Sequence, residues 1–116
     1  MTLTLIRAVL QRHRYNFVDE AQFQRGVAAA LANAGIAFTR EAKLDEHDRI
    51  DFLVGRIGIE VKIKGSLTNL TRQLFRYAKH DEIEALVVVT SQNRLSALPL
   101  TILGKPCEVL TFSRAF

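Results

Sequence analysis

The sequence has 116 residues and a formal net charge of +4, and 48% of its residues are hydrophobic and 24% charged. This length suits one domain over residues 1–116, and this composition excludes a disordered chain. The single cysteine, Cys107, excludes a disulfide framework and a cysteine zinc site. Because Arg7 interrupts the apolar N-terminal stretch, we expect no signal peptide, no membrane span and no membrane partner, and therefore a cytoplasmic protein.

The pattern of apolar residues, caps and turns predicts an α/β fold. In chain order the predicted elements are helices over 3–14 and 20–34, a strand over 36–44, hairpin strands over 49–54 and 57–64, a helix over 67–79, a strand over 85–90, a helical turn over 93–98 and a strand over 107–112. This order predicts a mixed central β-sheet with helices on both faces. Residues 1–18 form an N-terminal helical extension.

Local signals support these boundaries. Asp19, followed three residues later by Gln22, is a typical helix N-cap, and Ser66 stands in the same position before the third long helix. Gly55 opens a two-residue loop of the kind that joins hairpin strands. The run over 85–90 is apolar on both faces, which predicts a central strand covered on both sides.

One face of the hairpin is predicted to be apolar and the other polar. If Gly55 and Arg56 form the loop, hydrophobic residues of the two strands face each other, for example Ile50 and Val61. The apolar face takes Ile50, Phe52, Val54, Ile57, Ile59, Val61 and Ile63, and the opposite face takes Arg49, Asp51, Leu53, Glu60, Lys62 and Lys64.

The same register places Asp51 directly opposite Glu60, an arrangement that destabilises a sheet. A hard divalent cation between the carboxylates would remove that cost, because Mg²⁺ binds one or two carboxylates together with water and substrate phosphate. Lys62 lies on the same face, where it can hold an attacking water or neutralise a phosphate. The alternative is the solvated face of an amphipathic hairpin.

Two other helices carry related features. Glu20 lines up with the buried stripe of its helix, which is costly without a partner, although the helix dipole also favours a first-turn glutamate. Gln73 and Tyr77 share a face of the helix over 67–79. Beside them lies a basic stripe that can follow a phosphate backbone or simply be solvated, formed by Arg72, Arg76, Lys79 and His80.

The remaining candidates for chemistry are weaker. His13, His47 and His80 lie on three segments without metal-ligand spacing and are predicted to be surface residues. Cys107 is predicted to be a packed thiol rather than a nucleophile. No glycine-rich loop suited to phosphates is present, which argues against a nucleotide hydrolase.

Together these residues resemble the PD-(D/E)xK nuclease superfamily, whose signature is an aspartate, a spacer hairpin and then Glu-x-Lys. Asp51 and the tripeptide Glu60-Val61-Lys62 match this signature in the stretch IDFLVGRIGIEVK. Ile50 replaces the proline that usually precedes the aspartate.

Two further elements resemble particular branches of the superfamily. Glu20 is similar to the upstream helical glutamate of archaeal-type Holliday junction resolvases. Gln73 and Tyr77 resemble the Q-x-x-x-Y element of RecB-like exonucleases. The small size resembles stand-alone resolvases and phage-type nucleases.

The resemblance implies a restriction-endonuclease-like core and an endonuclease that hydrolyses DNA with Mg²⁺, or with Mn²⁺ in its place. The implied metal ligands are Asp51, Glu60, the backbone carbonyl of Val61 and, directly or through water, Glu20. Lys62 would position or activate the nucleophile, and Gln73 would orient Lys62 or the DNA strand. The implied nucleic-acid contacts are Lys64, Arg72, Arg76, Tyr77 and Lys79.

The sequence leaves other functions and assemblies open. One is a non-catalytic nucleic-acid-binding module that keeps the nuclease fold, and another is an accessory subunit whose protein partner supplies the DNA-binding surface. A homodimer would hold two active sites at a fixed separation, as a junction resolvase needs. Its interface would come from the apolar N-terminal segment or from the last strand with Leu110 and Phe112.

Overall fold

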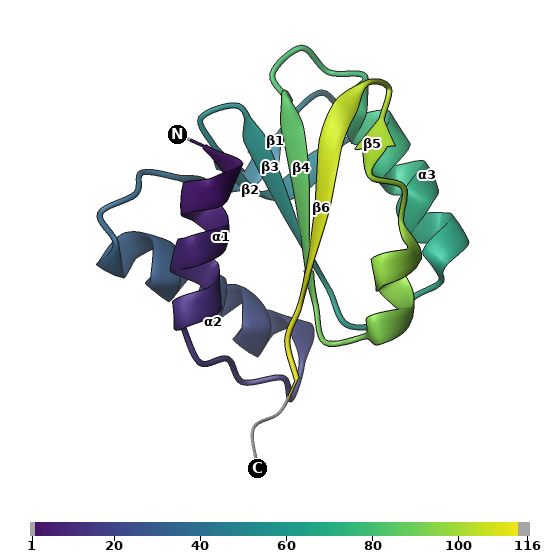
Figure 1. Cartoon of the computed structure of the whole chain (residues 1–116). Coiled ribbons are helices and arrows are strands. Elements are labelled where there is room, and N and C mark those ends of the chain that lie inside the picture. Colours follow the sequence, from purple (N-terminus) through teal and green to yellow (C-terminus); the bar gives the residue numbers. More distant parts are fainter. Residues whose placement is uncertain (1, 114–116) are drawn as a thin grey trace.

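A computed structural model describes residues 2–113 as a mixed β-sheet between two layers of helices (Figure 1). The helices are α1 (Leu3–Arg12), α2 (Glu20–Asn33), α3 (Leu67–Ala78) and the 3-10 helix η1 (Asn93–Ala97). The strands are β1 (Thr39–Lys43), β2 (Arg49–Val54), β3 (Ile57–Lys62), β4 (Ala85–Thr90), β5 (Thr101–Ile102) and β6 (Lys105–Thr111). The predicted α/β class and element order are confirmed. The sequence did not predict β5, because two residues are too few to show alternation.

Within the described residues the sheet has six strands in the order β1-β2-β3-β4-β6-β5. Strands β1, β2 and β3 are antiparallel neighbours, β4 and β6 continue parallel to β3, and β5 pairs antiparallel with β6. Helices α1 and α2 cover one face, and α3 with η1 covers the other (Figure 1). Every residue of β4 is buried, which confirms the predicted central strand.

The predicted caps begin the helices that flank the site. The Asp19 carboxylate accepts the N–H of Gln22 at 2.7 Å, and the Ser66 hydroxyl oxygen accepts the N–H of Asn69 at 3.0 Å. Each bond satisfies a helix N–H that has no partner within the helix. The first of these caps fixes where α2 starts and therefore where Glu20 lies.

Near its turn the β2–β3 hairpin has the predicted register. Phe52 pairs with Ile59, and Val54 pairs with Ile57. All four side chains belong to the apolar cluster beneath α1 and α2, as the alternation predicts. The two-residue loop is therefore sufficient to set this part of the register.

Farther from the turn, the predicted face of Ile50 is wrong. Ile50 packs in the cluster beneath α3, whereas Phe52 and Val61 belong to the cluster on the opposite face. The change of face occurs at Asp51, where the β1–β2 ladder skips one residue of each strand. The residue that the ladder skips on β1 is Glu41, whose φ of 51° is left-handed and interrupts the regular pleat.

Several apolar residues near both ends of the described chain pack against other parts of the same chain. Ile6 and Leu10 of α1 are completely buried, and Leu110 is 5% exposed. The ring of Phe112 lies 6.1 Å from the ring of Phe23 on α2. Ile6, Leu10 and Leu110 are thus packed within the chain, whereas Leu5 of the same N-terminal segment is 47% exposed. None of the helices in the described part of the chain is long and apolar enough to cross a membrane.

Candidate active site

The carboxylates of Asp51 and Glu60 lie together where β2 and β3 stop pairing. Asp51 Oδ2 accepts the N–H of Val61 at 2.8 Å, and Glu60 Oε1 accepts the N–H of Asp51 at 3.2 Å. These bonds connect the two strands beyond their last backbone pair, Phe52 with Ile59. Each carboxylate is therefore fixed by one of its oxygens to the backbone around the other carboxylate.

Burial and repulsion raise the pKa of both carboxyl groups. Burial is the main cause for Asp51, whose pKa rises to about 6 although the Val61 N–H lowers it. Burial and then the charge of Asp51 raise the pKa of Glu60 to about 8. The ammonium of Lys62 lowers both pKa values, but by less than burial raises them. A bound cation would relieve this pair, because it favours the charged form of each group.

Glu20 reaches this pair from α2, in the helical layer formed by α1 and α2. Its Oε1 accepts the N–H of Ile63 at 3.0 Å, so this glutamate has the partner that its position requires. Ile63 lies two residues beyond Val61, whose N–H the Asp51 carboxylate accepts, and the charge of Glu20 raises the pKa of both Asp51 and Glu60. The structure therefore brings Glu20, Asp51, Glu60 and Lys62 into one site.

Sequence reasoning missed a fourth carboxylate, that of Glu41 on β1. The flanking pairs of the β1–β2 ladder place Glu41 across from Asp51, and its charge raises the pKa of Asp51. Its Oε2 lies 4.0 Å from Arg49 Nη1. The sequence predicted the strand, but the register of that strand depends on the loop at 45–48, whose shape no alternation pattern predicts.

Two surface cavities meet at Lys62, on either side of the end of β3. The first has a volume of about 430 Å³ and lies along α3, where Arg72, Gln73 and Arg76 line it. The second has a volume of about 410 Å³ and is lined by Glu20 and Lys64 among others. Among the described residues no acidic side chain lines the first cavity, so its charged lining residues, Lys62, Arg72 and Arg76, are all basic.

The predicted nucleic-acid contact at Tyr77 is wrong. Tyr77 is 2% exposed, and its hydroxyl donates a hydrogen bond to the Arg49 carbonyl at 2.8 Å. Burial is the main cause that raises the pKa of this hydroxyl. Tyr77 therefore supports the start of β2 from inside the fold. Lys79, another predicted contact, lies over the ring of Phe75 at 5.0 Å and lines neither cavity.

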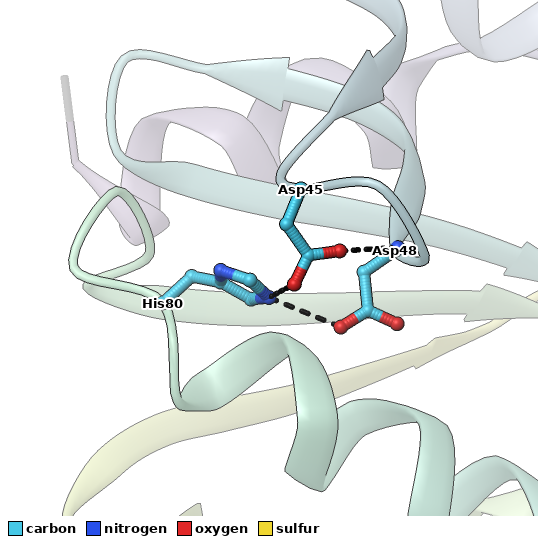
Figure 2. Close-up of side chains that lie close together, drawn as sticks. All are labelled: Asp45, Asp48 and His80. Carbon is cyan, nitrogen blue, oxygen red and sulfur yellow. Dashed lines mark hydrogen bonds and ion pairs between the residues drawn. The ribbon is translucent and has the colours of Figure 1, made fainter.

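A second polar cluster lies beside the C-terminal end of α3 (Figure 2). His80 Nε2 lies 3.0 Å from Asp48 Oδ2 and 3.3 Å from Asp45 Oδ2. One ligand atom from each residue lies within 4.8 Å of the others, so the group is able to hold a metal ion. His80, which the sequence predicts to be a surface residue, is only partly exposed, with 16% of its side chain accessible. The cluster joins segments far apart in the sequence, so no local pattern indicated it.

The site thus combines residues of α2, β2, β3 and α3. Cys107 lies outside it, buried, and burial raises the pKa of its thiol to about 11, which confirms the predicted packed thiol. In comparisons with known proteins, no family model, no curated protein and no solved structure matches this chain.

Proposed function

We propose that this protein is a metal-dependent nuclease that hydrolyses phosphodiester bonds of DNA on a restriction-endonuclease-like core. The observation that carries the proposal is the pair of Asp51 and Glu60, held together at the end of the hairpin with Lys62 beside them. Burying two carboxylates that repel each other costs stability. Strongly raised pKa values are typical of a functional site, and Lys62, two residues beyond Glu60, lines both cavities.

The order of elements gives further support. The segment from α2 to β4 has the α-β-β-β-α-β order of the superfamily that the sequence resembles. In this segment the hairpin that carries Asp51 and Glu60 lies next to the central, parallel β4. The candidate site therefore rests on the most buried part of the sheet.

The cavity along α3 supports a polyanionic substrate. Lys62, Arg72 and Arg76 line it, and Lys64 continues the basic surface into the second cavity. A DNA strand along α3 would therefore meet positive charge, whereas in the second cavity Lys64 is accompanied by the carboxylates of Asp19 and Glu20. Contacts of this kind position the backbone without reading the sequence.

The oxygen donors of the site fit Mg²⁺. Asp51 and Glu60 would hold the ion, and the Val61 carbonyl and Glu20 are further oxygen donors nearby. When bound, Mg²⁺ stabilises charge on the phosphate and lowers the pKa of a coordinated water. The Lys62 ammonium would hold the attacking water or stabilise the phosphate charge. In hydrolysis the oxygen of the attacking water forms a new P–O bond and gives up a proton, while the bond to the leaving oxygen breaks and that oxygen takes up a proton.

Cleavage of supercoiled, linear, single-stranded and four-way-junction DNA with Mg²⁺ or Mn²⁺ tests this proposal. We expect wild type to cut at least one of these substrates. Lys62→Ala should lower the rate by about a hundredfold or more and leave DNA binding largely intact, because the ammonium acts on the reacting groups. Lys43→Ala is the matched control, since it removes an exposed lysine of β1 and should cut like wild type.

The outcomes separate the proposal from the two other functions. If wild type cuts none of the four substrates with either metal, the proposed function is wrong. Salt-sensitive DNA binding without cleavage, unchanged by Asp51→Asn, would favour a non-catalytic binding module. Co-purification of a second protein that is required for DNA binding would favour an accessory subunit.

A further inference from the structure

The Asp48 carboxylate lies next to the candidate site and is almost completely buried. Asp48 is 7% exposed, in the loop between β1 and β2. Its Oδ1 accepts the Nε–H of Arg76 at 3.1 Å, and its Oδ2 lies 3.0 Å from His80 Nε2 (Figure 2). These contacts lower the pKa of Asp48, with the His80 bond as the largest cause. Asp48 therefore stays charged and ties its loop to the end of α3.

Asp45 fixes the backbone conformation of the loop at Asp48. The Asp45 carboxylate accepts the N–H of His47 and the N–H of Asp48, each at 2.7 Å. Such a side chain to backbone turn rigidifies a short loop. Because the loop backbone is rigid at this point, the Asp48 side chain stays directed toward α3.

The hydrogen bond to Asp48 occupies only one N–H group of the Arg76 guanidinium. A guanidinium has five N–H donors, and the Nε–H is the one that Asp48 accepts. The Arg76 side chain is 54% exposed and lines the cavity that also contains Lys62 and Gln73. A two-point contact with a phosphate requires the planar guanidinium to be held in one orientation. Asp48 supplies such an orientation.

We propose that Asp48 is a positioning residue that orients the Arg76 guanidinium for a two-point contact with a backbone phosphate of bound DNA. This inference rests on the proposed function, because it describes how the same site takes its substrate. Arg76 is the residue that contacts DNA, and Asp48 acts only through it.

The direction in which one substitution changes DNA affinity separates this role from a purely electrostatic one. Asp48→Asn keeps the size of the side chain and removes a negative charge close to the proposed DNA-binding surface of the protein. If Asp48 contributed charge alone, its removal would strengthen DNA binding. If Asp48 orients Arg76, Asp48→Asn should weaken DNA binding, by about fivefold.

Fluorescence anisotropy with a labelled duplex and a labelled four-way junction, in Ca²⁺ to keep the DNA intact, measures these affinities. We expect Asp48→Asn and Arg76→Gln each to raise the Kd, and the double variant to bind no more weakly than Arg76→Gln alone. Glu84→Gln is the matched control, because it breaks an exposed Arg–carboxylate pair of the same 3.1 Å length, with Arg56, that lines neither cavity. Its Kd should not rise.

Arg76→Lys keeps the test valid if Asp48→Asn does not fold. It preserves the positive charge but lacks both the Nε–H and the planar fork, so we expect a Kd about threefold or more above that of wild type. Circular dichroism checks that each variant is folded.

The results overturn the inference in three cases. These are equal or tighter DNA binding by folded Asp48→Asn, wild-type binding by Arg76→Lys, and stoichiometric Zn²⁺ binding that Asp48→Asn abolishes, which would make Asp48 a metal ligand with Asp45 and His80. A wild type that binds and cuts DNA while Asp48→Asn binds normally refutes this inference alone. A wild type that neither binds nor cuts DNA refutes the proposed function as well.

Discussion

Burial distinguishes the two interpretations that the sequence allows for the charged face of the hairpin. An Asp-x8-Glu-x-Lys spacing on an exposed hairpin is an ordinary solvated face. Glu60, however, is 4% exposed, and its neighbour Asp51 is half-buried. Because a buried carboxylate resists ionisation, both groups hold their protons at a higher pH than exposed carboxyl groups do. The solvated-face interpretation is therefore wrong for Glu60.

The raised pKa values predict that the metal-free protein becomes less stable as the pH rises. The unfolded chain releases these protons near 3.8 and 4.5, whereas the folded chain holds them to about 6 on Asp51 and about 8 on Glu60. Between those limits the folded state binds more protons, so the free energy of unfolding falls with rising pH. Asp45 and Asp48 act in the opposite direction, because folding lowers their pKa values from 3.8, but their effect lies below about pH 5.

Thermal unfolding in EDTA between about pH 5 and pH 8 measures this dependence. The melting temperature of wild type should fall across the range, and Asp51→Asn should flatten the slope. Glu82→Gln, which changes an exposed carboxylate of the α3–β4 loop, should keep the wild-type slope. The difference between the two variants assigns the slope to the carboxylate pair rather than to exposed carboxylates. An identical slope in Asp51→Asn would contradict the assignment.

At the scale of secondary structure, the sequence predicts the features that depend only on neighbouring residues. The cap at Asp19, the loop at Gly55 and the apolar run of β4 each follow from neighbouring residues, and all three are confirmed. The face of Ile50 and the partial burial of His80 depend on packing between distant segments, so alternation and spacing did not predict them.

The same distinction applies to the residues of the site. Asp51, Glu60 and Lys62 were predicted to lie together because a two-residue loop fixes the register of their strands, and the structure brings them together. For Tyr77, which shares a helix face with Gln73, the resemblance implies a nucleic-acid contact. How far that face turns toward the sheet depends on the packing of α3, and in the structure Tyr77 lies inside while Gln73 borders the cavity.

Tyr77→Phe tests the structural role of this tyrosine. The substitution removes the hydrogen bond to the Arg49 carbonyl, so the free energy of unfolding should fall by about 1 kcal/mol in a denaturant titration. DNA affinity should not change, because the hydroxyl does not reach the surface. Tyr15→Phe is the matched control, since it removes a 2.7 Å bond to the Leu10 carbonyl on the opposite side of the sheet. Weaker DNA binding by Tyr77→Phe alone would restore Tyr77 as a nucleic-acid contact.

At the scale of the whole molecule, the candidate site exists only when both helical layers are docked on the sheet. Glu20 comes from α2 on one face, Gln73 and Arg76 come from α3 on the other, and the central pair comes from the hairpin between them (Figure 1). The unfolded chain does not hold these groups together. A ligand of the site therefore binds the folded state, and its binding adds to the stability of the whole domain.

Mg²⁺ or Mn²⁺ should therefore raise the melting temperature of wild type. A metal concentration a hundredfold above Kd stabilises the folded state by about 2.7 kcal/mol, or roughly 10 °C for a domain of this size. Asp51→Asn should raise the metal-free melting temperature near pH 8, because it removes the repulsion from Glu60 while its side-chain oxygen still accepts the Val61 N–H. The same variant should respond less to metal, because it lacks one charged ligand.

Calcium distinguishes binding from chemistry in the same thermal measurement. Ca²⁺ also prefers oxygen ligands but accepts a looser arrangement of them, so it should stabilise wild type and support little cleavage. Glu82→Gln, which removes a carboxylate outside the site, should show the wild-type metal response and no gain in metal-free stability. If Asp51→Asn instead lowers the metal-free melting temperature, and neither protein responds to Mg²⁺, Mn²⁺ or Ca²⁺, then the carboxylate pair serves the fold and does not bind a metal.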